Sequence, residues 1–266
     1  MSIKLGFIGN GNMGYAILKG LIDQGVLERR ETAVYDLSEP VRQRAEELGV
    51  KAMETENELV SESEAVLLAV KPQHAKEILN RIGPALEGKL LLSIVAGYDA
   101  GTIRSYLGTD QVRILRIMPN TPALVREGVF ALDQGTDATD QEKRLAGQWF
   151  SAIGEVFWIE EKLFPVITGL SGGGPAYVAL FIEALADAGV KYGLYRDAAL
   201  KIAAKTVLGS AKLILDTNLH PAVLKDQVCS PGGTTIEGVQ ALEEGGFRAA
   251  VIHAVEESTR KAGKLV

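Results

Sequence analysis

The stretch Leu5-Gly6-Phe7-Ile8-Gly9-Asn10-Gly11-Asn12-Met13-Gly14 decides the fold of the amino-terminal part of the chain. Its first residues are apolar or small and favour a strand. From Met13 to Gln24 the apolar residues Met13, Ile17 and Leu21 recur every four positions, as on one face of a helix. A complete G-x-G-x-x-G motif stands between the two. A strand, this motif and a helix in that order are the context that a dinucleotide-binding unit requires.

The three glycines of this motif have distinct expected roles. Gly9 permits the tight turn, Gly11 lets the backbone approach a pyrophosphate, and Gly14 lets the helix pack closely on the strand. The phosphates would then meet the unpaired N–H groups and the positive dipole end of the helix. The alternative is an ordinary glycine turn, since a chain with 29 glycines matches the motif easily by chance. We expect cofactor contacts from Gly9, Asn10, Gly11, Asn12, Met13 and Gly14.

Up to about residue 160, short β-rich runs alternate with amphipathic stretches. The runs Ala65–Val70 and Leu90–Val95 are continuously apolar, as expected of parallel strands buried on both faces. Further strands are expected at Leu5–Ile8, Thr32–Tyr35, Arg113–Met118, Gly128–Leu132 and Val156–Ile159, with a helix at Pro40–Leu48 and core positions at Trp149 and Trp158. This alternation predicts an α/β fold whose first domain, residues 1–162, is a Rossmann-type doubly wound parallel sheet.

After residue 162 the strand pattern stops, and residues 163–266 are expected to form an all-α domain. Helices are expected at Pro175–Val190, Asp197–Leu215, Pro221–Val228, Ile236–Glu244 and Phe247–Lys264. Ala and Gly are frequent in these helices, so each helix has few large apolar side chains to bury. We therefore expect at least a dimer, in which a partner covers the helices. The alternative is a self-sufficient bundle with an alanine-rich solvent face.

Composition excludes several classes of protein. The chain has 266 residues, 47% of them hydrophobic, and a net charge of −6, which argues against disorder and gives no electrostatic reason to expect nucleic acid or an anionic membrane as partner. One cysteine excludes an internal disulfide, and the three histidines show no metal-ligand spacing. The longest uninterrupted apolar runs are far short of a membrane span, and a strand-like run starts at Ile3 without room for a signal peptide. We expect a soluble cytoplasmic protein.

Loops that follow other strands of the sheet belong to the same predicted crevice, because the carboxyl ends of parallel strands meet at one edge. Asp36 ends the second expected strand, where an acidic residue binds the adenosine ribose and repels a 2′-phosphate. It therefore favours NADH over NADPH. The alternative is that Asp36 caps a helix. Lys71 either reaches phosphate or ribose or is a solvated loop lysine. The expected cofactor contacts from these loops are Asp36, Ala69, Val70, Lys71, Pro72, Ala96 and Gly97.

Three later segments are too rich in special residues to be simple linkers: Arg116–Ala123, Gly169–Tyr177 and Lys225–Thr235. In the last, Ser230, Thr234 and Thr235 stand at a helix start, where hydroxyls and free N–H groups can cap the helix or bind a carboxylate. Capping alone does not explain Ser-Pro-Gly-Gly-Thr-Thr, because paired glycines raise the ordering entropy.

These segments, with Gly6–Met13 and the Ala-Val-Lys-Pro-Gln run at 69–73, resemble the pyrroline-5-carboxylate reductase family nearly end to end. The resemblance implies a Rossmann domain, a helical dimerisation domain, dimers gathered into larger rings, and NAD(P)H-dependent reduction of 1-pyrroline-5-carboxylate to L-proline. Two residues depart from the family pattern. Gly173 replaces a common Ser, and Asp36 replaces the small or basic residues of NADPH-using members.

The resemblance also implies roles for single residues. Ser230, Gly233, Thr234 and Thr235 would hold the substrate carboxylate and ring, with Thr235 near the imine nitrogen as the catalytic hydrogen-bond donor unless a bound water serves. Glu161 would line the proline site, Gln227 would lie near the nicotinamide, and Asn57 beside the adenosine, its register uncertain by one position.

The expected chemistry needs little from the protein beyond positioning, because a protonated cyclic imine accepts hydride without a metal or a covalent nucleophile. Two other functions remain as alternatives. A β-hydroxyacid dehydrogenase would need a general-base lysine early in the long interdomain helix, and Gly174–Leu180 offers none. A non-catalytic dinucleotide sensor would bind NADH without oxidising it when the imine is supplied, and would not need the Ser-Pro-Gly-Gly-Thr-Thr loop.

Overall fold

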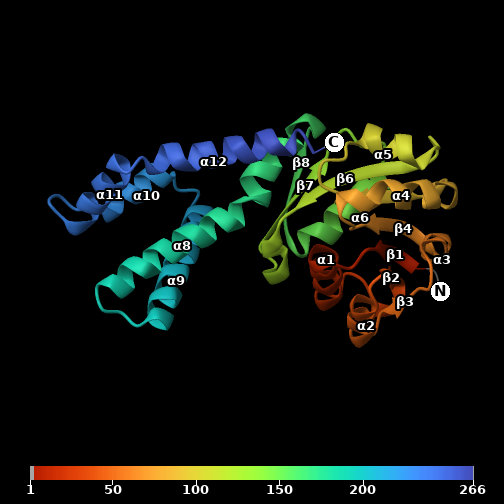
Figure 1. Ribbon diagram of the computed structural model, residues 1–266, viewed down its shortest axis with the longest axis horizontal. Helices are drawn as coiled ribbons and strands as arrows, with labels where there is room; N and C mark the ends of the chain where they lie inside the picture. The colour runs from red at the N-terminus through yellow and green to blue at the C-terminus, as the bar shows by residue number, and fades with distance from the viewer. Residues whose placement is uncertain (1–2, 266) are drawn as a thin grey trace. The chain divides into compact units, whose positions relative to one another are not determined.

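The computed structural model describes residues 3–265, which form two compact units (Figure 1). Unit 1 comprises residues up to Gly172 together with those from Glu257 onward, and unit 2 comprises Gly173–Glu256. The first boundary between the units thus falls ten positions after the boundary expected at residue 162, and the end of the chain belongs to unit 1 again. Each unit is described by itself below.

Unit 1 is built on one eight-stranded sheet in the order β3-β2-β1-β4-β5-β6-β7-β8. The strands are β1 (Ile3–Ile8), β2 (Thr32–Tyr35), β3 (Lys51–Ala52), β4 (Ser63–Leu68), β5 (Leu90–Ser93), β6 (Arg113–Pro119), β7 (Gly128–Asp133) and β8 (Gly154–Ile159). The order reverses direction at β1, with β2 on one side and β4 on the other, which is the topological switch point of a doubly wound sheet.

The expectation of a purely parallel sheet is wrong at one pair of strands. All neighbours from β3 to β6 are parallel, but β6 and β7 run antiparallel. The chain between them is only the short 3-10 turn Thr121–Val125 with its flanking residues. Antiparallel strands can be joined by such a short turn, whereas a parallel return needs a long crossover.

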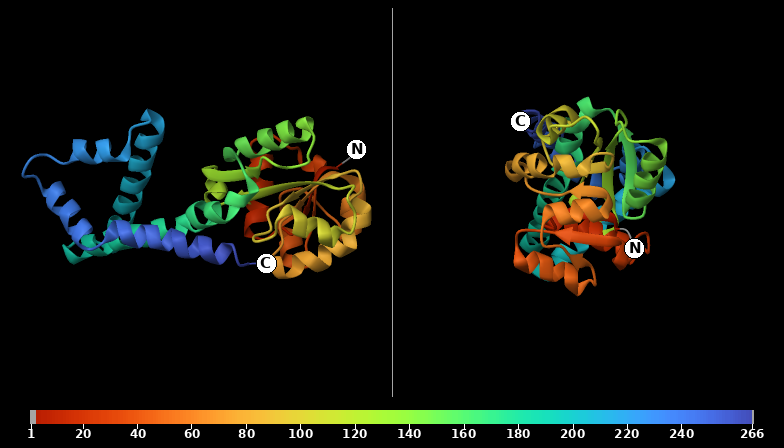
Figure 2. Two further views of the ribbon diagram at one scale, coloured as in Figure 1. Left: turned by 90° about the horizontal axis from the view of Figure 1, so that it is seen from above. Right: turned by 90° about the vertical axis from the view of Figure 1, so that its right-hand side faces the viewer.

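The helices of unit 1 cover both faces of the sheet (Figure 2). They are α1 (Asn12–Asp23), α2 (Glu39–Glu47), α3 (Glu56–Glu62), α4 (Pro72–Ile82), α5 (Ala100–Leu107), α6 (Asp140–Ser151) and the short α7 (Phe164–Ile167). Successive strand residues enter opposite cores, since Phe7 packs with α1 and α6 while Ile8 packs with α3, α4 and α5. The continuously apolar strands are therefore buried on both faces, as predicted. Trp149 lies in the core, but Trp158 is 37% exposed on the edge strand β8, so its predicted burial is wrong.

Unit 2 contains helices only. They are α8 (Gly174–Lys191), α9 (Arg196–Thr217), α10 (Pro221–Val228), α11 (Thr234–Glu244) and α12 (Phe247–Ala262), the last crossing into unit 1. α8 and α9 lie side by side as a hairpin (Figure 1), and their shared core consists of Ala186, Ala199 and Ala203 with Ile182 and Val190. This core is small, as expected from the alanine-rich sequence, and many large apolar side chains of these helices remain exposed within one protomer.

The helical stretch Glu161–Lys191 is long and apolar enough to cross a membrane by length and composition, with a mean hydropathy of 1.3 in its most apolar window, of which 6% is buried. One such stretch is weak support for a membrane span, because helices that bury against a partner have the same composition. The absence of a membrane partner stays a prediction.

Candidate active site

The switch point of the sheet carries a pocket of about 470 Å³ in unit 1. It lies at the carboxyl ends of β1, β2 and β4, the place where doubly wound sheets bind their ligands. Six residues predicted to contact the cofactor line it: Gly9, Gly11, Asp36, Ala69, Val70 and Lys71. These six of the fourteen lining residues could be predicted because each lies in a loop that follows an expected strand.

The glycines of the motif have the geometry that their predicted roles require. Gly9 has a φ of +87°, and a Cβ atom there would lie 2.7 Å from the carbonyl oxygen of Ala69. A Cβ on Gly14 would lie 2.6 Å from the carbonyl oxygen of Gly9, so α1 packs closely on the turn. Around Gly11 a Cβ would meet no atom within 4 Å. This open cradle stands at the N-terminus of α1 and fits a pyrophosphate.

Asp36 fixes the glycine-rich turn to the end of β2. Its Oδ2 atom accepts a hydrogen bond from the N–H of Asn10 at 2.8 Å, and its Oδ1 atom accepts one from the N–H of Ser38 at 2.9 Å. The carbonyl oxygen of Asn10 accepts a bond of 2.7 Å from Arg44, whose guanidinium lies over the ring of Tyr15. The alternative of a helix-capping Asp is wrong, because the N-cap of α2 is Ser38 and the Asp36 carboxylate bonds no N–H group within that helix. The carboxylate instead fixes the turn and lines the pocket.

The remaining predicted cofactor residues lie at different places in unit 1. Lys71 is exposed at the N-cap of α4, and Pro72 begins that helix, where a missing N–H costs nothing. Asn57 is exposed on α3 and is absent from the pocket wall, whereas its neighbour Glu56 is nearly buried and lines it. The structure thus places Glu56, one residue before Asn57, at the pocket. Ala96 is half-buried in the loop after β5.

A second pocket of unit 1, of about 350 Å³, contains Gly97 and Glu161 together with Arg116. Arg116 lies in the middle of β6, opposite Ser93 at the end of β5. Its side chain is only 10% exposed, and its Nη1 donates to Oε1 of Glu161 at 2.9 Å. The same carboxylate oxygen accepts the N–H of Ala100 at 2.7 Å. The guanidinium also lies 4.6 Å from the ring centroid of Phe164. Sequence reasoning gave Arg116 no role of its own.

Two carboxyl groups near this pair have shifted acidities. Hydrogen bonds from Thr102 hold the pKa of Asp99 below its ordinary value, and the charge of Arg116 adds to this effect. Burial raises the pKa of Asp133 above its ordinary value, and the nearby negative charge of Glu161 acts in the same direction. Asp99 is therefore a stable anion at the rim of the pocket, whereas ionised Asp133 is costly.

The predicted substrate loop lies in unit 2, between α10 and α11. Gly232 has a φ of +67°, and Gly233 is the N-cap of α11 without any side-chain cap. The hydroxyls of Ser230, Thr234 and Thr235 form no hydrogen bond within the described part of the chain, and all three residues are exposed. The capping alternative is therefore not realised, and these hydroxyls remain free for a ligand. Gln227 is exposed in the last turn of α10.

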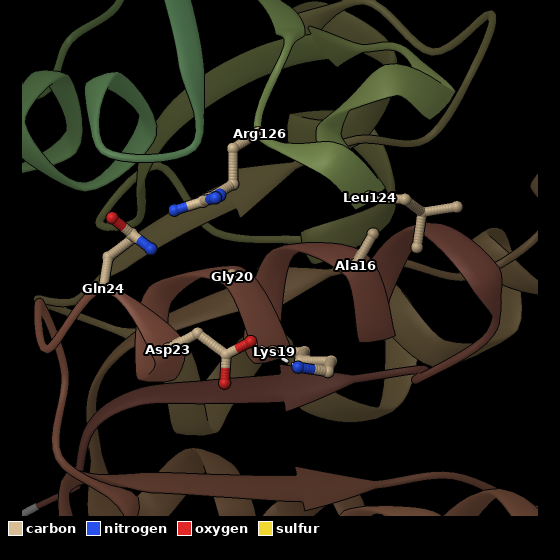
Figure 3. A pocket seen from close by; sticks show the side chains of 7 residues that line it. All are labelled: Ala16, Lys19, Gly20, Asp23, Gln24, Leu124 and Arg126. Atoms are coloured by element: carbon tan, nitrogen blue, oxygen red, sulfur yellow. Dashed lines mark hydrogen bonds and ion pairs between the residues drawn. The ribbon is translucent and has the colours of Figure 1, made fainter.

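A further hollow, of about 360 Å³, lies between α1 and the turn that holds Leu124 and Arg126 (Figure 3). Lys19 pairs with Asp23 along its floor. It lies away from the carboxyl ends of the strands, and no predicted site residue lines it. Among residues 3–265, no group of three or more His, Cys, Asp or Glu side chains could hold a metal ion.

Comparison with known proteins agrees with this geometry. Residues 161–265 match the family model for pyrroline-5-carboxylate reductase dimerisation, and residues 4–97 match that of the NADP oxidoreductase, coenzyme F420-dependent family. The chain is 44% identical to the pyrroline-5-carboxylate reductase of Glycine max over 268 residues, covering 99% of this chain and 96% of the relative. It belongs to the pyrroline-5-carboxylate reductase family. The Escherichia coli enzyme of that name is 43% identical over 267 residues, covering 100% of this chain and 99% of the relative.

Solved structures extend this likeness to the fold. The crystal structure of Plasmodium falciparum pyrroline carboxylate reductase with NADP bound has a TM-score of 0.90 at 35% identity, covering 98% of this chain and 97% of the other. A 3-hydroxyisobutyrate dehydrogenase from Mycobacterium tuberculosis has a TM-score of 0.53 at 17% identity, which shows a shared fold alone. The predicted family, fold class and reductase function are confirmed. A β-hydroxyacid dehydrogenase would need a general-base lysine early in α8, but the only lysine of α8 is the terminal Lys191.

Proposed function

We propose that the pocket at the switch point and the loop after α10 together carry the reduction of 1-pyrroline-5-carboxylate to L-proline. The observation that carries this assignment is the open cradle at Gly11, flanked by glycines that admit no side chain, in a chain that also presents three unbonded hydroxyls at a helix start. A bound reduced dinucleotide supplies the hydride that the C=N bond receives. The protein supplies orientation and limits water.

The cofactor would be held along the carboxyl edge of the sheet. We assign its contacts to Gly9, Asn10, Gly11, Asn12, Met13, Gly14, Asp36, Asn57, Ala69, Val70, Lys71, Pro72, Ala96, Gly97 and Gln227. The glycine-rich turn and the N-terminus of α1 would bind the pyrophosphate. The loops after β4 and β5 would line the path toward the nicotinamide. The assignment of Asn57 has the least support, because Glu56 lines the pocket and Asn57 does not.

We propose a preference for NADH over NADPH. The Asp36 carboxylate lines the pocket at the end of β2, where it can accept the ribose hydroxyls and would repel a 2′-phosphate. Nη1 of the nearby Arg42 donates to the backbone carbonyls of Asp36 and Leu37, at 2.6 Å and 3.2 Å. These bonds occupy N–H donors of Nη1 that a 2′-phosphate would otherwise need.

The substrate would be held by Ser230, Gly233, Thr234 and Thr235, with Glu161 lining the proline site. The exposed N-terminus of α11 offers N–H groups and hydroxyls to the carboxylate. The hydroxyl of Thr235 would donate a hydrogen bond to the ring nitrogen of the neutral imine and, once that nitrogen is protonated, would accept its N–H. No metal is needed for this step, because the protonated imine is already electrophilic.

We further propose that the chain works as a cytoplasmic homodimer, with dimers gathered into a ring. The helices of unit 2 match a dimerisation family and leave large apolar side chains exposed in one protomer. A second copy packed on these helices would bury them and enlarge a core that now consists of small alanine contacts.

The decisive experiment follows the absorbance of NADH and of NADPH in separate assays after 1-pyrroline-5-carboxylate is added, with L-proline measured as the product. We expect oxidation of the cofactor in step with proline formation, faster with NADH. A protein that binds the dinucleotide but leaves it reduced would be a sensor, and the proposed activity would be wrong.

A further inference from the structure

The loop that follows β5, residues 94–99, is constrained by one hydrogen bond, by one close approach of the chain, and by a bond at the residue that follows it. The hydroxyl of Tyr98 donates to the carbonyl oxygen of Pro72 at 3.0 Å, which joins it to the loop after β4. Gly97 has a φ of +84°, and a Cβ there would lie 2.6 Å from the Cβ of Leu265. The third constraint is at Ala100, the residue after the loop, whose N–H is held by Glu161. A loop tied in this way has little freedom to change its position.

Glu161 joins this loop to β6 through a single carboxylate oxygen. Its Oε1 atom accepts both the N–H of Ala100 at 2.7 Å and Nη1 of Arg116 at 2.9 Å. Ala100 is the first residue of α5, so the bond satisfies one of the donors that a helix start leaves unpaired. Glu161 is also the residue at which the match to the dimerisation family begins.

Arg116 determines where this carboxylate can lie. The side chain of Arg116 is only 10% exposed, and its guanidinium packs against the ring of Phe164. A buried guanidinium in contact with a ring has few alternative rotamers, so the carboxylate that it binds is also fixed. A series of direct contacts therefore connects β6 to the Gly97 loop. Arg116 binds Glu161, and Glu161 binds the N–H of Ala100 at the end of the loop.

We propose that Arg116 and Glu161 are positioning residues of the reductase reaction, which set the place of the Gly97 loop and thereby the affinity for the reduced dinucleotide. This inference rests on the proposed function, which assigns Ala96 and Gly97 to the cofactor. It differs from a direct role of Glu161 at the substrate, because it requires Arg116 and acts on the cofactor. It also explains why a buried arginine paired with a half-buried glutamate is kept here, at the edge of the sheet where ligands bind.

The same strand offers a matched control. Arg113, three positions earlier on β6, forms a comparable ion pair with Glu142, with distances of 2.8–3.0 Å. This pair lies at the amino-terminal end of β6, away from the carboxyl edge, and lines neither pocket of the candidate site. If the Arg116–Glu161 pair contributes only to the stability of the fold, substitutions in the two pairs should therefore affect cofactor affinity equally.

The test compares Arg116→Lys, Glu161→Gln and their double variant with Arg113→Lys and Glu142→Gln. Dissociation constants for NADH and NADPH are measured by fluorescence titration without substrate, beside the KM values of both reactants and the melting temperature. Lysine keeps the charge and glutamine keeps an acceptor, so these variants are the mildest ones at each position. We expect Arg116→Lys to weaken cofactor binding about tenfold with the KM for 1-pyrroline-5-carboxylate nearly unchanged, and Glu161→Gln to weaken cofactor binding by a similar factor.

The double variant should be no weaker than either single variant, because residues that act as one unit are not additive. The two control variants should lower the melting temperature without changing cofactor affinity. Wild-type affinity in Arg116→Lys, or equal losses in the Arg113 and Arg116 variants, would overturn the inference. Wild-type cofactor affinity in Glu161→Gln together with a raised substrate KM would also overturn it, in favour of direct substrate contact alone. Failure of the wild type to oxidise the cofactor would instead contradict the proposed function.

Discussion

The carboxylate of Asp36 accepts the N–H of Asn10 at 2.8 Å, so the end of β2 and the glycine-rich turn after β1 are joined directly. The other carboxylate oxygen accepts the N–H of Ser38. One side chain therefore shapes the turn that would hold the pyrophosphate and also forms the pocket wall where the ribose would lie. Any test of cofactor preference at this position has to separate its charge from its hydrogen bonds.

We expect Asp36→Ser to weaken or reverse the preference for NADH. Two like charges about 4 Å apart near a protein surface repel by about 4 kcal/mol, so removing the carboxylate should lower the NADH-to-NADPH ratio of kcat/KM at least about tenfold. Steady-state kinetics with both cofactors measures the ratio. Asp36→Asn is the control, because it removes the charge while keeping an oxygen for the turn. Equal ratios in the wild type and in Asp36→Ser would remove Asp36 from the determinants of preference.

Gly9→Ala and Gly11→Ala should separate folding from cofactor binding. Alanine at residue 9 adopts a left-handed φ at a cost of about 1–2 kcal/mol and clashes with the carbonyl of Ala69. Its free energy of unfolding should fall by at least that amount in urea denaturation. Alanine at residue 11 meets no protein atom, so its stability should stay within about 0.5 kcal/mol of wild type, while its affinity for the dinucleotide falls. A stable Gly9→Ala protein would contradict the packing described here.

Much of unit 1 was predictable because its strands are buried on both faces and its turns follow motif spacing. Continuous apolar runs marked β4 and β5. In unit 2, the helix α10 was predicted residue for residue as Pro221–Val228. The helix α4 was not predicted from the sequence, because Pro72 was placed only in a loop at the cofactor. Its buried positions Ala75, Ile78, Leu79 and Ile82 have helical spacing, which is the signal that could have found it.

Features that depend on which segments meet in space were not predictable. The antiparallel β6–β7 pair and the exposed edge position of Trp158 follow from strand order, which local patterns do not encode. The same holds for Arg116 and Glu161, which lie 45 positions apart. In contrast, the roles of Gly9, Gly11 and Gly14 could be predicted, since they depend only on the local turn between one strand and one helix.

Asp133→Asn should remove a pH dependence of stability. Burial raises the pKa of this carboxyl in the folded state, so the folded protein holds its proton more tightly than the unfolded chain does. Wild-type stability should therefore fall as the pH rises from the ordinary carboxyl range through the raised pKa. Asparagine avoids the buried charge and keeps an acceptor for the N–H of Gly135.

The measurement is the free energy of unfolding in urea at several pH values. The asparagine variant should equal the wild type at low pH and become the more stable of the two as the pH rises. Asp110→Asn, at an exposed carboxylate of the same unit, is the control and should follow the wild-type curve. A constant difference between Asp133→Asn and wild type at all pH values would show that titration of Asp133 is not its cause.

Thr235→Ala should lose activity without losing stability. The hydroxyl does not cap α11, whose N-cap Gly233 has no side-chain bond, so melting should be unchanged. Removing one well-placed hydrogen-bond donor lowers kcat about hundredfold in other enzymes. Steady-state assays of Thr235→Ala beside Thr235→Ser, which keeps the hydroxyl, measure this loss. Unchanged kcat and KM in the alanine variant would show that the hydroxyl is dispensable and would favour a bound water as the donor.

The exposed apolar face of α9 should be a contact between two copies of the chain. Leu208 and Leu215, 53% and 68% exposed in one protomer, are seven positions apart and so share one face of the helix. We expect sedimentation at micromolar concentration to give a dimer or a multiple of it. Leu208→Glu should shift the equilibrium toward the monomer, because a charge buried at an interface is costly. Ser210→Glu, at an exposed position on another face of α9, should not do so, and a stable wild-type monomer would exclude the dimer.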